Sequence, residues 1–290
     1  MQNLRYVIAS VVFVTFFVAC DKYDIQGFFM SPSKERVNER FDQSIAYNTD
    51  HQEDTLVVAD GEGYLFYTAA DVHVKKTAEH LARYIDIARD DEGALFATVL
   101  GDITDQKGGL KIAHDTIENH KGESIVRVLA GNHDIYFDQW AEYYDLFGSS
   151  TYYVVVKTPT ARDLFIALDS SCGSLGKRQT KWLEDVLIEK RGAHRHCIVM
   201  THTHFFDRDM SQFPTGNFSI EETAVLTNLF TKYDVKRGLR DLNGKGVLAG
   251  LTNISDVRAT KIVDGVTFPD HGKLFYRGYN VANLVNGFSA

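Results

Sequence analysis

The stretch Gly101-Asp102-Ile103-Thr104-Asp105, which follows the apolar run Ala94–Leu100, decides the fold of this chain. Two comparable stretches flank it, Asp71-Val72-His73 and Gly131-Asn132-His133-Asp134, and each also follows an apolar run. Asp102 lies 31 residues after Asp71, and Asn132 lies 30 residues after Asp102. A step of about 30 residues is the length of one strand–helix unit in a parallel sheet. The spacing therefore predicts an α/β fold in which these three turns meet at one edge of a sheet.

The side chains in these three turns are carboxylates, imidazoles and an amide. In open α/β sheets, ligands bind at the carboxyl ends of the strands, which is where the turns lie. Oxygen and nitrogen donors without a thiolate suit Mn, Fe, Zn or Mg. The pattern therefore predicts a metal site at this edge of the sheet.

Hydrophobic periodicity and turn signals predict the other elements. The predicted strands are Thr55–Ala59, Tyr64–Ala70, Ala94–Leu100, Ile125–Ala130, Tyr152–Val156, Leu164–Leu168 and Cys197–Thr201. The predicted helices are Lys75–Arg89, Leu110–His120, Asp138–Phe147, Gln179–Lys190 and Ile220–Tyr233. A turn signal at 60–63 separates the first two strands and predicts a β-hairpin. The expected order is this hairpin, a βαβαβ unit, and then mixed strands and helices.

The first residues of the chain predict export. Arg5 is the only charge before Cys20, and the apolar run Tyr6–Ala19 is short for a transmembrane helix. The small residue before Cys20 resembles a bacterial lipobox, in which the cysteine is lipidated and becomes the mature N-terminus. An uncleaved membrane anchor is the alternative, and both place the body of the protein outside the cytoplasm, in the periplasm or at the cell surface. We predict a lipoprotein signal peptide over 1–19, a polar tether over 20–54 and one folded domain over 55–290.

Composition narrows the possible partners. The whole chain has a formal charge of −8, and loss of Arg5 with the signal peptide takes the mature chain to −9. An acidic protein does not attract polyanions, so nucleic acid is an unlikely substrate. Cys172 and Cys197 are too few for a disulfide scaffold, and neither has the setting of a catalytic thiol. No protein partner is inferred, and the expected membrane contact is through lipidated Cys20.

Taken together, Asp71-x-His73, Gly101-Asp102-x-x-Asp105, Gly131-Asn132-His133-Asp134 and the later Thr201-His202 resemble the motifs of the calcineurin-like metallophosphoesterase family. The stretch 168–183 also resembles the middle segment of that family, and the likeness runs from about Leu56 to about Asn253. The resemblance implies a β-sandwich of mixed sheets flanked by helices, in αββα layers. It also implies metal-dependent hydrolysis of a phosphate mono- or diester in a small phosphorylated substrate.

The resemblance implies two divalent ions, Mn, Fe, Zn or Mg, that clamp a phosphate and activate a water. By this likeness, Asp71 and His73 would bind the first ion, and Asn132 and His202 would bind the second. Asp102 would bind both, because one carboxylate can give an oxygen to each.

The same resemblance assigns two catalytic roles. His133 would stabilise the transferring phosphoryl group and protonate the leaving oxygen. Asp105 would orient His133. In purple acid phosphatases a tyrosine ligand stands in the place of Asp105, so its absence here argues against that branch.

One departure from the family pattern bears on the metal site. The family normally ends its ligand set with Gly-His-x-His after a late strand, and the best candidate here is Gly250-Leu251-Thr252-Asn253. Leu251 has no donor atom, and Asn253 offers only a carbonyl oxygen. His204 or His271 could substitute, although His202 is favoured over His204 as a ligand because it directly ends a predicted strand.

Two functions remain open. The first is a metal-dependent phosphoesterase, favoured by the presence of His133 and Asp105, since a binding protein needs no leaving-group acid. The alternative is a catalytically weak phosphate- or ligand-binding relative with an impaired metal site, favoured by the missing terminal histidines. Each polar residue taken alone could be a turn or cap residue, but three motifs at one spacing make that explanation a poor one.

Overall fold

The computed structural model describes residues 34–51, 55–61, 63–203 and 218–239, together with short strands over 261–263, 267–268, 272–273 and 276–280. The predicted signal peptide, Cys20 and the Gly250–Asn253 segment lie outside the described residues. Within the described part of the chain, no helix is both long and apolar enough to cross a membrane.

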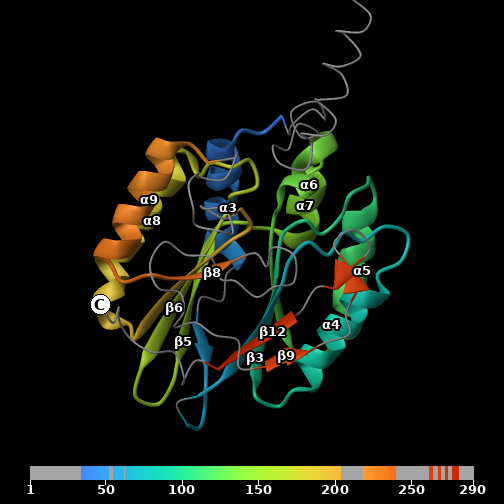
Figure 1. Cartoon of the computed structure of the whole chain (residues 1–290), viewed down its shortest axis with the longest axis horizontal. Coiled ribbons are helices and arrows are strands. Elements are labelled where there is room, and N and C mark those ends of the chain that lie inside the picture. The colour runs from blue at the N-terminus through green and yellow to red at the C-terminus, as the bar shows by residue number, and fades with distance from the viewer. Residues whose placement is uncertain are drawn as a thin grey trace, which may run out of the picture.

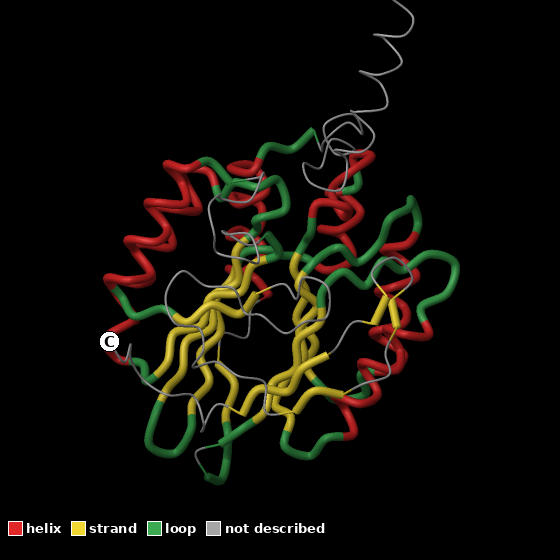
Figure 2. The backbone as a smooth tube through the Cα atoms, in the orientation of Figure 1, coloured by secondary structure: helices red, strands yellow, loops and turns green. Residues whose placement is uncertain are grey.

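Two five-stranded sheets stack face to face (Figure 2). The first has the order β1-β5-β6-β7-β8, with bounds Thr55–Val57, Tyr152–Lys157, Arg162–Leu168, His196–Thr201 and Lys236–Leu239. The second has the order β4-β3-β2-β12-β9, with bounds Ile125–Leu129, Ala94–Leu100, Leu65–Ala69, Tyr276–Asn280 and Lys261–Val263. A separate two-stranded ribbon pairs β10 (Thr267–Phe268) with β11 (Gly272–Lys273). In the second sheet β2, β3 and β4 are parallel, as the even spacing of the three motifs predicts.

Alternate residues of each strand face opposite sides, and this alternation builds three apolar layers. Phe96 and Leu100 of β3 point into the layer between the sheets, where they meet Phe165 of β6 and Met200 of β7. The rings of Phe66, Phe96 and Phe165 contact one another there at centroid distances of 5.1 to 5.4 Å. This aromatic layer joins the sheets into one sandwich.

Helices cover the two outer faces of the sandwich (Figure 1). On the second sheet, Ala97 and Val99 pack under α4 (Glu79–Asp90), α5 (Gly109–His120) and α7 (Trp140–Phe147). On the first sheet, the other face of β6 and β7 packs under α8 (Gly176–Lys190) and α9 (Ile220–Lys232). The arrangement confirms the predicted αββα layers. Three short helices, α6 (Asn132–Ile135), η1 (Tyr136–Asp138) and η2 (Arg191–Ala193), complete the connections.

The predicted N-terminal hairpin is wrong. β1 pairs in parallel with β5, with Leu56 opposite Val156, and β2 belongs to the other sheet. Leu56 and Tyr64 are both buried between the sheets, so the chain passes from one sheet to the other between them. A turn signal in the sequence predicts that the chain changes direction. It does not predict which strand the next segment pairs with.

The prediction of a tether over 20–54 is wrong for residues 37–51. These residues form α3 (Val37–His51), which packs on the domain and buries Arg40, Phe41 and Ser44. The Arg40 guanidinium bonds to Asp169 at 2.8 Å and to Ser171 at 3.2 Å, and lies over the Trp140 ring at 5.5 Å. The sequence of this segment is polar because a buried ion pair, rather than an apolar stripe, holds the helix on the domain.

Candidate metal centre

The loops after β2 and β3 bond to each other and bring two of the motifs together. The Asp71 N–H donates to the Gly101 carbonyl at 3.0 Å, and the His73 N–H donates to the Asp102 carbonyl at 2.9 Å. Asp71, His73 and Asp102 all have left-handed backbone, with φ of 56°, 48° and 53°. Non-glycine residues rarely adopt this conformation, and it concentrates at functional sites.

Two glycines allow the loops to approach so closely. A Cβ on Gly101 would lie 2.7 Å from Nδ1 of His202, and Gly101 itself has φ of 87°. A Cβ on Gly131 would lie 2.2 Å from the backbone nitrogen of Asp102. The glycine that opens each of the two later motifs is therefore required by close packing at the site.

The Asp134 carboxylate holds the loops after β3 and β4 together. It is fully buried and accepts N–H groups from Gly131 at 2.7 Å, Ile103 at 2.8 Å and Thr104 at 3.1 Å. Burial and the charge on Asp102 raise the pKa of Asp134 to about 7. The motif pattern alone predicts no role for Asp134; in the structure, its hydrogen bonds connect the second motif to the third.

One group of ligand-type side chains consists of Asp71, Asp102 and His202, all buried, with one donor atom of each within 4.8 Å of the others. His202 directly follows β7, and its backbone N–H donates to Ser170 Oγ at 3.0 Å. Ser170 belongs to the loop after β6 and was not expected at the site. Its hydroxyl also accepts the Thr203 N–H at 2.9 Å, so it holds the end of β7 in place.

The ring of His202 has the orientation of a metal ligand. Its Nδ1 lies 2.8 Å from the Leu100 carbonyl oxygen and donates to it. In the neutral imidazole Nε2 then carries a lone pair, and this atom lies 2.9 Å from Asn132 Oδ1 and 3.2 Å from Asp102 Oδ1. Three electron-pair donors therefore converge on one point, which is the arrangement that a cation satisfies.

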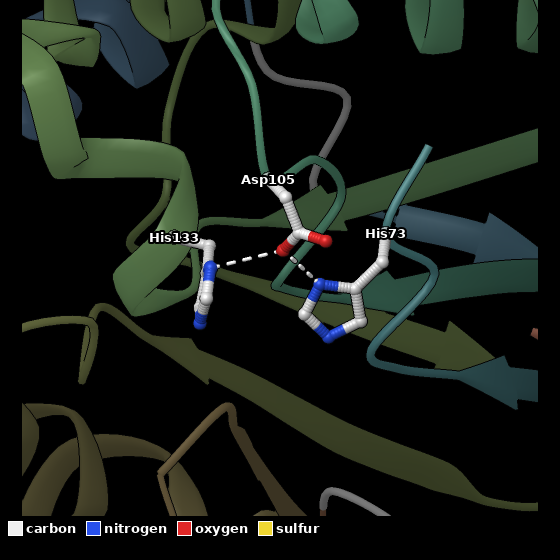
Figure 3. Close-up of side chains that lie close together, drawn as sticks. All are labelled: His73, Asp105 and His133. Carbon is white, nitrogen blue, oxygen red and sulfur yellow. Dashed lines mark hydrogen bonds and ion pairs between the residues drawn. The ribbon is translucent and has the colours of Figure 1, made fainter. Parts of the chain in front are cut away.

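The second group consists of His73, Asp105 and His133 (Figure 3). Asp105 Oδ1 lies 2.9 Å from Nδ1 of His133, and the same oxygen bonds to Nδ1 of His73. Both rings therefore donate from Nδ1, and their Nε2 atoms are left for other partners. Nε2 of His73 lies 3.8 Å from Asp71 Oδ1 and 3.9 Å from Asp102 Oδ2.

Carboxylates dominate the electrostatics of this group. Burial works to lower the pKa of His73, but bonds to Asp105 and Asp71 and the charge on Asp102 outweigh it and raise the pKa to about 10. Burial also works to lower the pKa of His133, and the bond to Asp105 and the charge on Asp102 again raise it. The carboxylates favour positive charge at this edge, so the donor set fits a cation.

Asp102 lies between the two groups. Its Oδ1 faces His202 and accepts the His133 backbone N–H at 3.0 Å, whereas its Oδ2 faces His73. The seven residues singled out from the sequence thus meet at one place in the fold. Leu251, Asn253, His204 and His271, which belong to the terminal part of the expected ligand set, lie outside the described residues.

The four-layer fold and these two clusters define an α/β-sandwich protein with a candidate two-ion metal site. The sequence profile described as "Calcineurin-like phosphoesterase" matches residues 65–240, more than half of the chain. The chain belongs to this family.

Several solved structures have a similar fold. A dimetal phosphatase from Danio rerio is 13% identical, with a TM-score of 0.46, over 62% of this chain and 82% of that chain. GAP50, the anchor in the inner membrane complex of Plasmodium, is 15% identical, with a TM-score of 0.43, over 60% of this chain and 64% of that chain. Purple acid phosphatase PPD1 from yellow lupin seeds is 13% identical, with a TM-score of 0.46, over 62% of this chain and 38% of that chain. No curated protein sequence matches the chain.

Proposed function

We propose that this protein is an exported, metal-dependent hydrolase of phosphate mono- or diesters that uses two divalent ions. The observation that carries the proposal is the position of Asp102. Its two carboxylate oxygens face different ligand groups, with Oδ1 3.2 Å from His202 Nε2 and Oδ2 3.9 Å from His73 Nε2. A carboxylate between two sets of donors can give one oxygen to each of two adjacent cations, as a two-metal site uses.

In this proposal Asp71, His73 and Asp102 hold one ion, and Asp102, Asn132 and His202 hold the other. When bound, such ions neutralise charge on the phosphate and lower the pKa of a water so that it can attack. The backbone bonds between the Asp71 and Asp102 loops keep these donors fixed before any ion arrives. Three protein donors for each ion leave positions open for substrate and water.

His133 is proposed to protonate the leaving oxygen of the substrate. Its Nδ1 is committed to Asp105, so its proton-carrying Nε2 is the atom available to the substrate. The side chain is 30% exposed, whereas those of Asp71, His73 and Asp102 are almost fully buried. His133 can therefore reach a substrate that approaches from solvent, and Asp105 keeps its ring in one orientation.

The proposal includes anchoring through lipidated Cys20, supported by the apolar run Tyr6–Ala19. The predicted tether is shorter than 20–54, because α3 packs on the domain from Val37 onward. Lipid at Cys20 would therefore hold the domain within about 17 residues of the membrane, a reach of at most roughly 60 Å if the segment is extended.

The test is metal analysis of the purified protein together with hydrolysis of an aryl phosphate and a bis-aryl phosphate. We expect bound divalent metal and turnover that chelation abolishes and added metal restores. Metal without turnover on either ester would support the alternative, a phosphate-binding relative impaired by Leu251 and Asn253. Absence of bound metal in metal-supplemented buffer would contradict the proposed metal-dependent hydrolase.

A further inference from the structure

Tyr136 contacts two adjacent members of the proposed site at once. It is 5% exposed and lies four residues after Asn132, at the start of η1. Its hydroxyl oxygen accepts a hydrogen bond from Asn132 Nδ2 at 2.8 Å. Its ring lies 5.0 Å from the imidazole of His133, centroid to centroid, at an interplanar angle of 50°.

The hydroxyl contact selects which end of the Asn132 amide faces the proposed ions. An amide can rotate to present either its oxygen or its NH₂ group, and only the oxygen can coordinate a cation. Because Nδ2 is bonded to Tyr136, Oδ1 is turned toward His202 Nε2 and lies 2.9 Å from it. Without this hydroxyl the amide could rotate, and Oδ1 would then no longer face the proposed ion.

The ring of Tyr136 gives His133 a second ring contact, in addition to the one with His73. The His73 ring stands nearly perpendicular to His133, at 5.1 Å and 87°, and Tyr136 packs at 5.0 Å. The bond from Nδ1 to Asp105 sets the orientation of the His133 ring at one edge. The packing contacts of the Tyr136 and His73 rings support this orientation and keep Nε2 pointed in one direction.

The segment that carries Tyr136 is itself held on both sides. Asp134 is fixed by its three backbone N–H bonds. Phe137 and Asp138 have left-handed backbone, with φ of 56° and 62°, and the Asp138 carboxylate accepts the Lys34 N–H at 3.1 Å. Consecutive left-handed residues that are not glycine are strained and persist only where their surroundings fix them. Tyr136 therefore occupies a defined position.

We propose that Tyr136 is a positioning residue with two separable actions, one on a metal ligand and one on the leaving-group acid. The hydroxyl presents the Asn132 oxygen to the second ion, and the ring orients His133 toward the leaving oxygen. The inference rests on the proposed function, since it assigns the support of that same site.

The first action is tested with Tyr136→Phe, which removes the hydroxyl and keeps the ring. Metal-free protein is titrated with Mn²⁺, and bound metal is followed directly. We expect the affinity for the second ion, the one proposed to bind Asn132, to fall about tenfold to a hundredfold, as for other residues that support a metal ligand. At saturating Mn²⁺ the turnover should return to the wild-type value, because the ring is still present.

The matched control is Tyr84→Phe, which also removes a buried tyrosine hydroxyl with a 2.8 Å bond, here to the Thr98 carbonyl under α4. This variant should leave both Mn²⁺ affinities unchanged. Equal loss of affinity in the two variants would make the effect one of general stability and would overturn the first action.

The second action is tested with Tyr136→Leu at saturating Mn²⁺, using phenyl phosphate and 4-nitrophenyl phosphate. A poor leaving group needs the acid more than a good one. The ratio of the two rates should therefore shift against phenyl phosphate by about tenfold or more, up to the full contribution of a general acid. The ratio does not depend on how much of the variant is folded, so a simple loss of stability cannot produce the shift.

The results distinguish failure of the proposed function from failure of the proposed role of Tyr136. If wild-type protein binds no Mn²⁺, the proposed function fails. If wild-type protein binds two ions but Tyr136→Phe binds both with unchanged affinity, the proposed function stands and the role of the hydroxyl is wrong. If Tyr136→Leu keeps the wild-type rate ratio, the role of the ring is wrong.

Discussion

Arg40 of the N-terminal helix and Asp169 of the loop after β6 form a fully buried ion pair, with Arg40 Nε 2.8 Å from Asp169 Oδ2. The two residues are 129 positions apart in the chain, so the pair ties α3 to the domain. Asp169 also accepts the N–H of Ser171 at 3.0 Å, next to the Ser170 hydroxyl that holds His202. The N-terminal helix is therefore connected to the proposed site through one short loop.

Removing one partner of this pair should destabilise the protein strongly. Arg40→Ala leaves Asp169 buried without its cation, and we expect a loss of about 3–5 kcal/mol in the free energy of unfolding. The matched control is Arg178→Ala, which breaks an exposed ion pair with Asp42 between the same helix α3 and α8. That variant should lose at most about 1 kcal/mol. Urea unfolding of both variants measures the difference, and similar values would mean that the buried pair does not anchor α3.

Substitutions of Asp102 and of His133 should have different effects on bound metal and on turnover. Asp102→Asn should release more metal than any other single substitution, because only Asp102 serves both proposed ions. His133→Ala should keep most of the metal and lower turnover by roughly a hundredfold or more. Metal content per chain, measured beside the rate of aryl phosphate hydrolysis, tests this division. Equal metal loss in the two variants would contradict it.

The metal-free protein should lose stability as the pH rises above neutrality. His73 has a pKa raised to about 10 from its ordinary 6.5, so its protonation stabilises the folded state fully below about pH 6.5. This stabilisation disappears as the pH rises through about 10. Asp105→Asn removes a carboxylate that raises the pKa, so the dependence should become shallower. Urea unfolding in chelator from pH 6.5 to 9.5 measures both slopes, and identical slopes would exclude Asp105 as a cause.

The double change Leu251→His and Asn253→His should strengthen metal binding. This prediction comes from the sequence, because both residues lie outside the described part of the chain. Imidazoles at these positions would supply the two donors that the family motif normally has, so we expect tighter Mn²⁺ binding and faster hydrolysis at low metal. Unchanged stoichiometry and rate would mean that 250–253 is not the terminal metal loop, and His204 or His271 would become the next residue to replace.

Cys20→Ser should abolish anchoring. A lipidated cysteine adds buried methylenes that keep the protein at the membrane, and serine cannot accept this modification. Membrane fractionation of wild type and variant is the measurement. Normal processing and anchoring of the variant would favour the uncleaved apolar anchor over the lipobox.

The parallel strands and the position of the site could be predicted from the sequence for a physical reason. Buried parallel strands are continuous apolar runs, and the Asp102 and Asn132 turns follow them at one repeat length, which fixes a common edge. The pairing of β1 could not be predicted, because Thr55–Val57 is short and its partner β5 lies about 100 residues further along the chain. Tyr136 lies four residues after Asn132, but this spacing is too common to predict a role from the sequence. Only the hydrogen bond between the two side chains indicates the role.

The left-handed backbone at Asp71, His73 and Asp102 places stability and function in opposition at this edge of the sheet. Glycine at any of these positions would relieve backbone strain, which costs of order 1–3 kcal/mol for each such residue. Replacing Asp102 would also remove the negative charge that raises the pKa of Asp134. A search for variants of higher thermal stability, carried out without metal and without an activity screen, would therefore select against the residues that form the site.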